Sequence, residues 1–240
     1  AAAARGCADL GQAYEFGDQA DLNFPAALAG EMLRAAAGDA ERMQLLSALM
    51  SEVVRKEDET IRATPFCAMF GQGHQHFLSR LAAVGRGGDE VWDAPEKIRL
   101  ALFQTWVRED PTESFRWDPA EDRRYAHRFK NPSGDKGLTV HGANRLAVAG
   151  LPLLTCVPVR RGPELGLPAV ATELGRRGRN LRVRWPIWTR PARLAAVVNM
   201  VRCVQTDRPP RGCAWVAVQE CERISAGKFF NFTRARVVSG

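Results

Sequence analysis

The sequence predicts an α+β fold, with a helical N-terminal half followed by a mixed half that contains a small β-sheet. Apolar residues recur at helical spacing in several stretches of the first 110 residues, whereas residues 180–185 alternate apolar and polar side chains, as a half-buried strand does. Hydrophobic residues make up 45% of the 240 positions, which suffices for a substantial core and argues against wholesale disorder. We expect a mainly helical region over residues 1–110 and an α+β region over residues 111–240, as two units or as one domain.

Two amphipathic helices are predicted near the N-terminus. Pro25 suits the first turn of a helix, Gly38 interrupts the pattern, and Asp39 can cap the next helix by accepting hydrogen bonds from early backbone N–H groups. The residues predicted to face the core are Leu28, Met32, Leu33 and Ala36 in the first helix and Met43, Leu46, Met50 and Val53 in the second.

Residues 64–70 are apolar and aromatic, which predicts a short buried strand. A glycine turn over residues 71–76 leads into a helix, but it lacks the full G-x-G-x-x-G signature of a dinucleotide site. His74 and His76 lie in this turn and are interpreted as packed side chains, with a general base for RNA cleavage as the alternative. Another helix is predicted from Pro95. Its apolar residues are expected to face inward (Ile98, Leu102, Trp106) and its basic residues outward (Lys97, Arg99).

Residues 117–154 combine more helix-start signals, turn residues, histidines and basic residues than any other stretch. Asp118, Pro119 and Glu121 form a helix-capping pattern; the competing interpretation is a carboxylate pair of Asp118 and Asp122 for acid–base chemistry or a metal. Residues 131–137 have the composition of a turn.

A further helix is predicted from Gly142, with a face of small and apolar residues toward a packed neighbour (Ala143, Leu146, Ala147, Gly150). A glycine at a helix start leaves backbone N–H groups that attract phosphate, and Arg145 and Asn144 can add contacts. Alternatively, Arg145 pairs with a structural carboxylate.

The positive charge of the chain is concentrated in one segment. Residues 160–211 hold twelve arginines and three acidic residues, a net charge of +9, whereas the whole chain carries +7 and the remainder therefore −2. This segment predicts an anionic partner such as nucleic acid.

Within this segment, residues 180–185 place Leu181, Val183 and Trp185 on one face of a strand and Arg182 and Arg184 on the other, about 7 Å apart. The arginines are candidate backbone contacts, and three more arginines and one tryptophan complete the predicted surface (Arg176, Arg177, Arg179, Trp188). The alternative is a half-buried strand with a solvated face.

The C-terminal part predicts a helix after Pro191 and two strands. Residues 213–218 predict a buried strand, and residues 228–236 alternate aromatic and polar side chains, as in a core strand or an RNA-binding platform. The apolar face of the helix is predicted to point inward (Leu194, Val197, Val198, Val201).

The remaining composition argues against several classes of protein. Six cysteines without a C-x-x-C pair predict reduced, mostly buried thiols; a zinc site from Cys203, Cys213, Cys221 and a histidine is the alternative. No stretch has the length of a signal-peptide core or a membrane span, so we expect a cytoplasmic protein without membrane contact. No metal or cofactor is expected.

Four short motifs resemble a known family. They are W-D-P-x-x-D-R-R-Y-A at residues 117–126, N-P-S at 131–133, V-x-G-A-N-R-L-A at 140–147 and L-P-L at 151–153. Their order is similar to that in effector-associated subunits of minor type I CRISPR systems, of the subtype called U or G. The likeness covers residues 64–154 and the K-F-F-N-F-T ending at 228–233, and it carries no catalytic residue. It implies a part in a ribonucleoprotein that binds guide RNA or target DNA.

The leading hypothesis is a non-catalytic, nucleic-acid-binding subunit of a CRISPR-type complex, which contacts the backbone of guide RNA or target DNA beside other subunits. One alternative is a metal-independent ribonuclease with a histidine general base (His74, His76, His127 or His141). The other is a protein-interaction module whose basic face meets an acidic partner.

Overall fold

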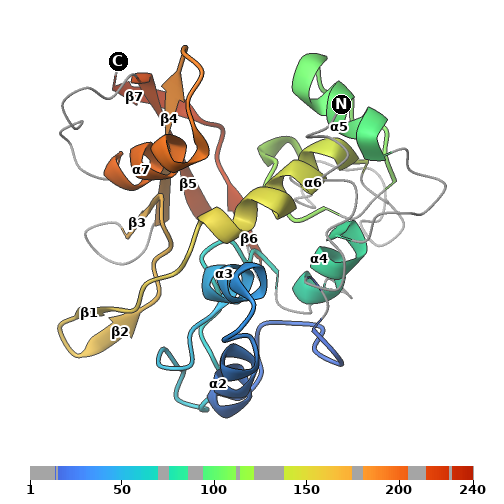
Figure 1. Cartoon of the computed structure of the whole chain (residues 1–240). Helices are drawn as coiled ribbons and strands as arrows, with labels where there is room; N and C mark the ends of the chain where they lie inside the picture. The colour runs from blue at the N-terminus through green and yellow to red at the C-terminus, as the bar shows by residue number, and fades with distance from the viewer. Residues whose placement is uncertain are drawn as a thin grey trace.

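The computed structural model shows six α-helices and seven β-strands in the part of the chain that it describes. The described residues are 14, 16–69, 76–85, 94–111, 114–121, 138–174, 181–204, 215–226 and 229–239. Most helices precede the strands in the chain, and the strands form one two-stranded and one five-stranded sheet (Figure 1). The predicted α+β class, with a helical N-terminal half, is confirmed.

The first two helices are α2 (Ala26–Ala35) and α3 (Ala40–Leu49). Asp39 caps α3 as predicted, because its Oδ1 accepts a hydrogen bond of 3.0 Å from the Arg42 backbone N–H. Helix α3 ends at Leu49, before Val53. The expectation that Val53 faces the core is therefore wrong, and this side chain is exposed.

The segment before helix α4 (Phe77–Gly85) is buried but is not a strand. The Cys67 backbone N–H donates to the Thr64 carbonyl at 3.0 Å, which closes a turn where we predicted extended backbone. Further on, the Ala68 carbonyl accepts a hydrogen bond from the Phe230 N–H, so this segment meets the C-terminal sheet. Phe70 and residues 71–75 lie outside the described residues.

Helix α5 (Ala94–Phe103) packs against α6 (His141–Gly150) through a glycine. A Cβ at Gly142 would lie 2.0 Å from the Lys97 carbonyl oxygen, so only glycine permits this approach. Ile98 is buried as predicted, but Leu102 and Trp106 are exposed and Lys97 is turned inward to Asp110. The predicted face of α5 is thus right at Ile98 and Arg99 and wrong at Lys97, Leu102 and Trp106.

The main sheet is built on β4 (Leu181–Trp188) and β5 (Trp215–Ala226), which pair antiparallel. Strand β3 (Thr172–Leu174) pairs with β4. The strands β6 (Phe229–Phe232) and β7 (Arg236–Ser239) both pair with β5. Helix α7 (Leu194–Cys203) lies beside this sheet (Figure 1). Two short strands, β1 (Val159–Arg161) and β2 (Glu164–Gly166), form the separate hairpin.

One hydrophobic core joins the helical and the β-rich parts. It runs from Tyr14 through the helices to Phe232 of β6, and the Tyr14 hydroxyl donates to the Val148 carbonyl of α6 at 2.9 Å. Phe115 of this core is stacked on the partly buried ring of Trp117, with centroids 4.4 Å apart. No helix in the described part of the chain is long and apolar enough to span a lipid bilayer.

Candidate nucleic-acid interface

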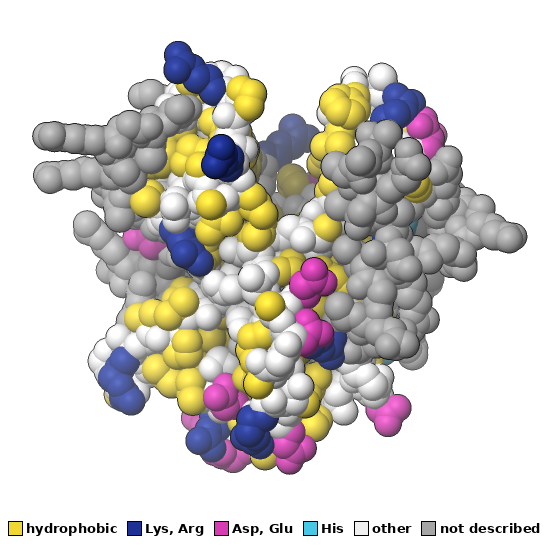
Figure 2. Space-filling view, in the orientation of Figure 1, with side chains coloured by type: hydrophobic (Ala, Val, Ile, Leu, Met, Phe, Trp, Pro, Cys, Tyr) yellow, Lys and Arg dark blue, Asp and Glu magenta, His cyan; other side chains and the backbone are white. Residues whose placement is uncertain are grey.

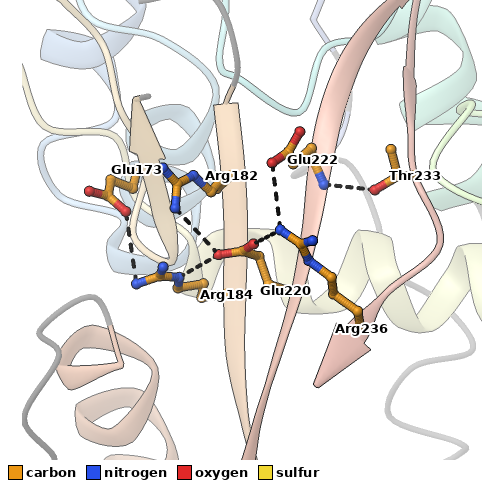
Figure 3. Close-up of polar contacts among 7 residues, drawn as sticks. All are labelled: Glu173, Arg182, Arg184, Glu220, Glu222, Thr233 and Arg236. Carbon is orange, nitrogen blue, oxygen red and sulfur yellow. Dashed lines mark hydrogen bonds and ion pairs between the residues drawn. The ribbon is translucent and has the colours of Figure 1, made fainter. Parts of the chain in front are cut away.

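The predicted strand exists, and Arg182 and Arg184 share one face of β4. The register sets Arg182 opposite Glu222 and Arg184 opposite Glu220 on β5. Directly opposed residues of an antiparallel pair lie close enough for their side chains to interact. Figure 3 shows the side chains of both arginines turned toward Glu220, while Glu222 lies against Arg236.

Glu220 is the centre of this network and is 2% exposed. Its Oε2 lies 2.8 Å from Arg184 Nε and 3.8 Å from Arg182 Nη1, and its Oε1 accepts a hydrogen bond of 3.0 Å from Arg236 Nη2 (Figure 3). Burial raises the pKa of Glu220, but the hydrogen bonds from Arg184 and Arg236 and the charges of Arg184 and Arg182 outweigh it. The net result is a pKa below the ordinary value of a glutamate. Glu220 therefore stays ionised at neutral pH.

Two further acids complete the network. Glu173 of β3 lies 3.8 Å from Arg184, and Glu222 lies 3.9 Å from Arg236. Among the described residues, the three arginines and three glutamates of this network thus balance in charge. The side chains of Arg184 and Arg182 are only 15% and 32% exposed. The β4 pair faces protein, which does not fit the predicted rail of two solvated guanidinium groups.

A second set of arginines lies where β4 leaves the sheet. Arg190 and Arg193 are exposed between β4 and α7, and Arg202 is exposed in the last turn of α7. In the described part of the chain none of these three makes a hydrogen bond or an ion pair. Trp188, the last residue of β4, is also exposed and lies two positions before Arg190. Unlike the β4 pair, these groups are available to an anion.

The start of α6 does not fit the predicted phosphate site. Arg145 is 1% exposed, and its Nη1 donates to the Val84 carbonyl, so it cannot reach a ligand at the surface. The backbone N–H of His141 donates to Asp110 Oδ2 at 2.9 Å, which occupies the helix N-terminus with a protein carboxylate. Asn144 is half-buried, and its Nδ2 has no hydrogen-bond partner in the described structure. The predicted contacts Arg176, Arg177 and Arg179 lie outside the described residues.

The described histidines have structural surroundings. Nδ1 of His76 lies 2.8 Å from Asp21 Oδ2, and the same carboxylate accepts the Phe77 N–H at 3.0 Å, which ties the start of α4 to Asp21. His141 is buried, and burial followed by the charge of Arg145 lowers its pKa to about 4. His74 and His127 lie outside the described residues.

The other candidate groups are likewise structural. Asp118 pairs with Arg108 at 2.6 Å and accepts the Ala120 N–H at 2.9 Å, as predicted for a cap, while Asp122 is not described. Burial raises the pKa of the Cys67 thiol to about 12, so it is protonated. Within the described residues, no group of three His, Cys, Asp or Glu side chains is placed to hold a metal.

The acids of β5 carried a signal that the sequence reasoning missed. Glu220 and Glu222 are spaced i, i+2, as are Arg182 and Arg184. An E-x-E strand beside an R-x-R strand places opposite charges in register on one face.

Comparisons with protein families, with curated proteins and with solved structures found no match to this chain.

Proposed function

We propose that the protein binds the phosphate backbone of nucleic acid through the surface formed by Trp188, Arg190, Arg193 and Arg202, without catalysing a reaction on it. The observation that carries the proposal is the exposure of these three arginines without an acidic partner in the described structure. Guanidinium groups bind phosphate in bidentate geometry, and an adjacent exposed tryptophan can stack a base.

The distribution of charge supports this location. Figure 2 shows Lys and Arg side chains around α7, whereas over the helices at the N-terminal end of the chain Asp and Glu side chains lie among Lys and Arg. A polyanion is attracted more strongly to the first area than to the second. The resemblance to CRISPR effector-associated subunits extends the proposal: the protein acts within a ribonucleoprotein, on guide RNA or target DNA.

The test is binding of fluorescent single-stranded RNA and DNA, followed by anisotropy over a series of salt concentrations. Replacing Arg190 and Arg193 together with alanine should weaken binding of all sequences alike. It should also lower the slope of log affinity against log salt by about 1.4, since each phosphate contact on a single strand contributes about 0.7.

The matched control replaces Arg34 and Arg62, two exposed arginines of the helical part, and should leave the slope unchanged. Equal slopes for both double variants would contradict the proposed surface. Cleavage of the RNA in a metal-free buffer would favour the ribonuclease alternative instead.

A further inference from the structure

An apolar hollow of the described structure lies between α7, α6 and the inner face of the main sheet. It has a volume of about 360 Å³ and is lined by side chains from segments far apart in the chain, among them Trp117, Ala147, Val183, Val198 and Phe232. All thirteen lining residues are uncharged. Figure 2 shows hydrophobic side chains on both sides of the hollow between the part that holds α7 and the part that holds α5 and α6. We call this hollow the α6–α7 groove.

The apolar surface continues beyond the groove along α7. Val197, Val198 and Val201 line the groove, and Leu194, one turn earlier on the same helix face, is 64% exposed. The sequence predicted that this face points into the protein, and at Leu194 that prediction is wrong. The extended stripe matches an extended apolar occupant better than a single small molecule.

Helix α6 presents small residues to the same groove. Ala147 and Gly150 line it, and Ala143 lies one turn before Ala147 beside a smaller adjoining pocket. The sequence predicted that this face meets a packed neighbour. In the structure the buried face of α6 is a different one, formed by His141, Gly142, Arg145 and Val148. The small-residue face therefore has room for a helix from outside the described structure.

The charges beside the groove select the occupant. Arg193 directly precedes α7 and Arg202 lies one turn after Val198, and both are exposed. A second copy of this chain would bring the same arginines and a net charge of +7 toward one another. An acidic partner gains from these charges on both sides of the apolar stripe.

From the apolar lining, the open stripe and the basic borders, we infer that the α6–α7 groove binds an amphipathic helix of another protein, with aliphatic or aromatic side chains on one face and acidic residues at its flanks. This is the helix-in-groove mode of recognition, in which residues spaced i, i+3, i+4 and i+7 act as anchors. The inference shares Arg193 and Arg202 with the proposed nucleic-acid surface, but the lining of the groove carries no charge, so variants of the lining test the inference separately.

The probe is a fluorescein-labelled helical peptide with leucines at i, i+4 and i+7 and glutamates at the flanks, added to the full chain and followed by anisotropy. Saturable binding is expected. A peptide with lysine in place of each glutamate should bind at least about tenfold more weakly, and a scrambled acidic peptide should not saturate. Failure of the acidic peptide to bind, or equal binding of the lysine peptide, overturns the inference.

Two neutral variants test the location. Ala147→Trp fills the groove and should weaken peptide binding about tenfold or more, whereas Ala35→Trp, at an exposed alanine of α2, should not. Val198→Gln provides a second groove variant, and a circular-dichroism melt shows that each variant is folded. Unchanged peptide affinity in both folded groove variants overturns the inference.

Competing occupants give different outcomes. RNA affinity that falls in Ala147→Trp together with peptide affinity would assign the groove to nucleic acid. A dimer in sedimentation equilibrium that Val198→Gln dissociates would assign it to a second copy. Either result overturns the inference. Loss of RNA binding in the Arg190 and Arg193 double variant does not predict the peptide affinity of Ala147→Trp. Failure of one proposal can therefore be distinguished from failure of the other.

Discussion

Buried charged side chains have different partners in the helical part and in the β-rich part. In the helical part, Arg145 is held by a backbone carbonyl, and Asp21 by one histidine and one backbone N–H. In the main sheet, Glu220 forms ion pairs with three arginines, two of which remain partly exposed. Charge in the helical part therefore fixes helix ends and packing. In the sheet it is balanced between three arginines and three glutamates and links β3, β4, β5 and β7.

The largest expected effect comes from the aromatic centre of the helical part. Phe77 is fully buried, with ring centroids 5.8 Å from Phe115 and 6.3 Å from Trp117. Phe77→Ala should lower the free energy of unfolding by about 3–5 kcal/mol through lost burial and a cavity. Urea denaturation measures it. Phe103→Ala, at an exposed ring of α5, should change stability by only about 0.5 kcal/mol. Similar losses in both variants would refute the described packing.

The second prediction concerns pH and His141. Its pKa in the fold is about 4, below the ordinary value of 6.5, so the unfolded chain binds a proton more readily. His141 therefore does not reduce the free energy of unfolding above about pH 6.5, but its protonation in the unfolded chain lowers this free energy by about 2–3 kcal/mol as the pH drops to about 4. His141→Gln should remove this decline, as urea denaturation across the pH range will show. The same decline in the variant would assign it to other groups.

The smallest effect is expected in the sheet. Glu220→Gln should cost about 1–3 kcal/mol, because three arginines lose their buried counter-charge while remaining near solvent. The folded pKa of Glu220 is lowered, so its contribution is present above the ordinary value of 4.5 and is lost as the pH falls through the folded pKa. Thermal melts of the unchanged protein and of Glu220→Gln, recorded from about pH 7 to about pH 3, should therefore give melting temperatures that converge only at the acidic end.

Glu222→Gln is the matched control, since this side chain is 31% exposed and its carboxylate lies 3.9 Å from Arg236. It should cost no more than about 1 kcal/mol. A larger loss in Glu222→Gln than in Glu220→Gln would remove Glu220 from the centre of the network.

Local signals in the sequence predicted the helices well. Asp39 and Pro25 mark helix starts through backbone chemistry that needs no distant partner, and α3 and α2 begin where they indicate. Helix faces were harder: the inward side of α5 depends on Gly142, more than forty residues later in the chain, whose missing side chain admits the Lys97 backbone. Periodicity cannot reveal such a contact.

The candidate site was predicted in part. Alternation correctly placed Arg182 and Arg184 on one face of a strand, but the partner strand determines whether that face is free. Arg145 shows the same limit, because its position in the first turn of α6 suggested a ligand contact while packing against α4 buries it. Residues whose role depends on one element were predictable, and those that depend on two were not.

The contacts between the residues around Thr64 and the last strands also bear on how the chain folds during synthesis. Arg223 of β5 donates to the Pro65 carbonyl at 2.8 Å, and Phe232 of β6 belongs to the core built mainly by the helices. These contacts join residues more than 150 positions apart in sequence, and such long loops form slowly. While the ribosome is still making the sheet, the helical part exposes the apolar surface that β6 will cover. We therefore expect the nascent chain to depend on chaperones until its last strands have emerged.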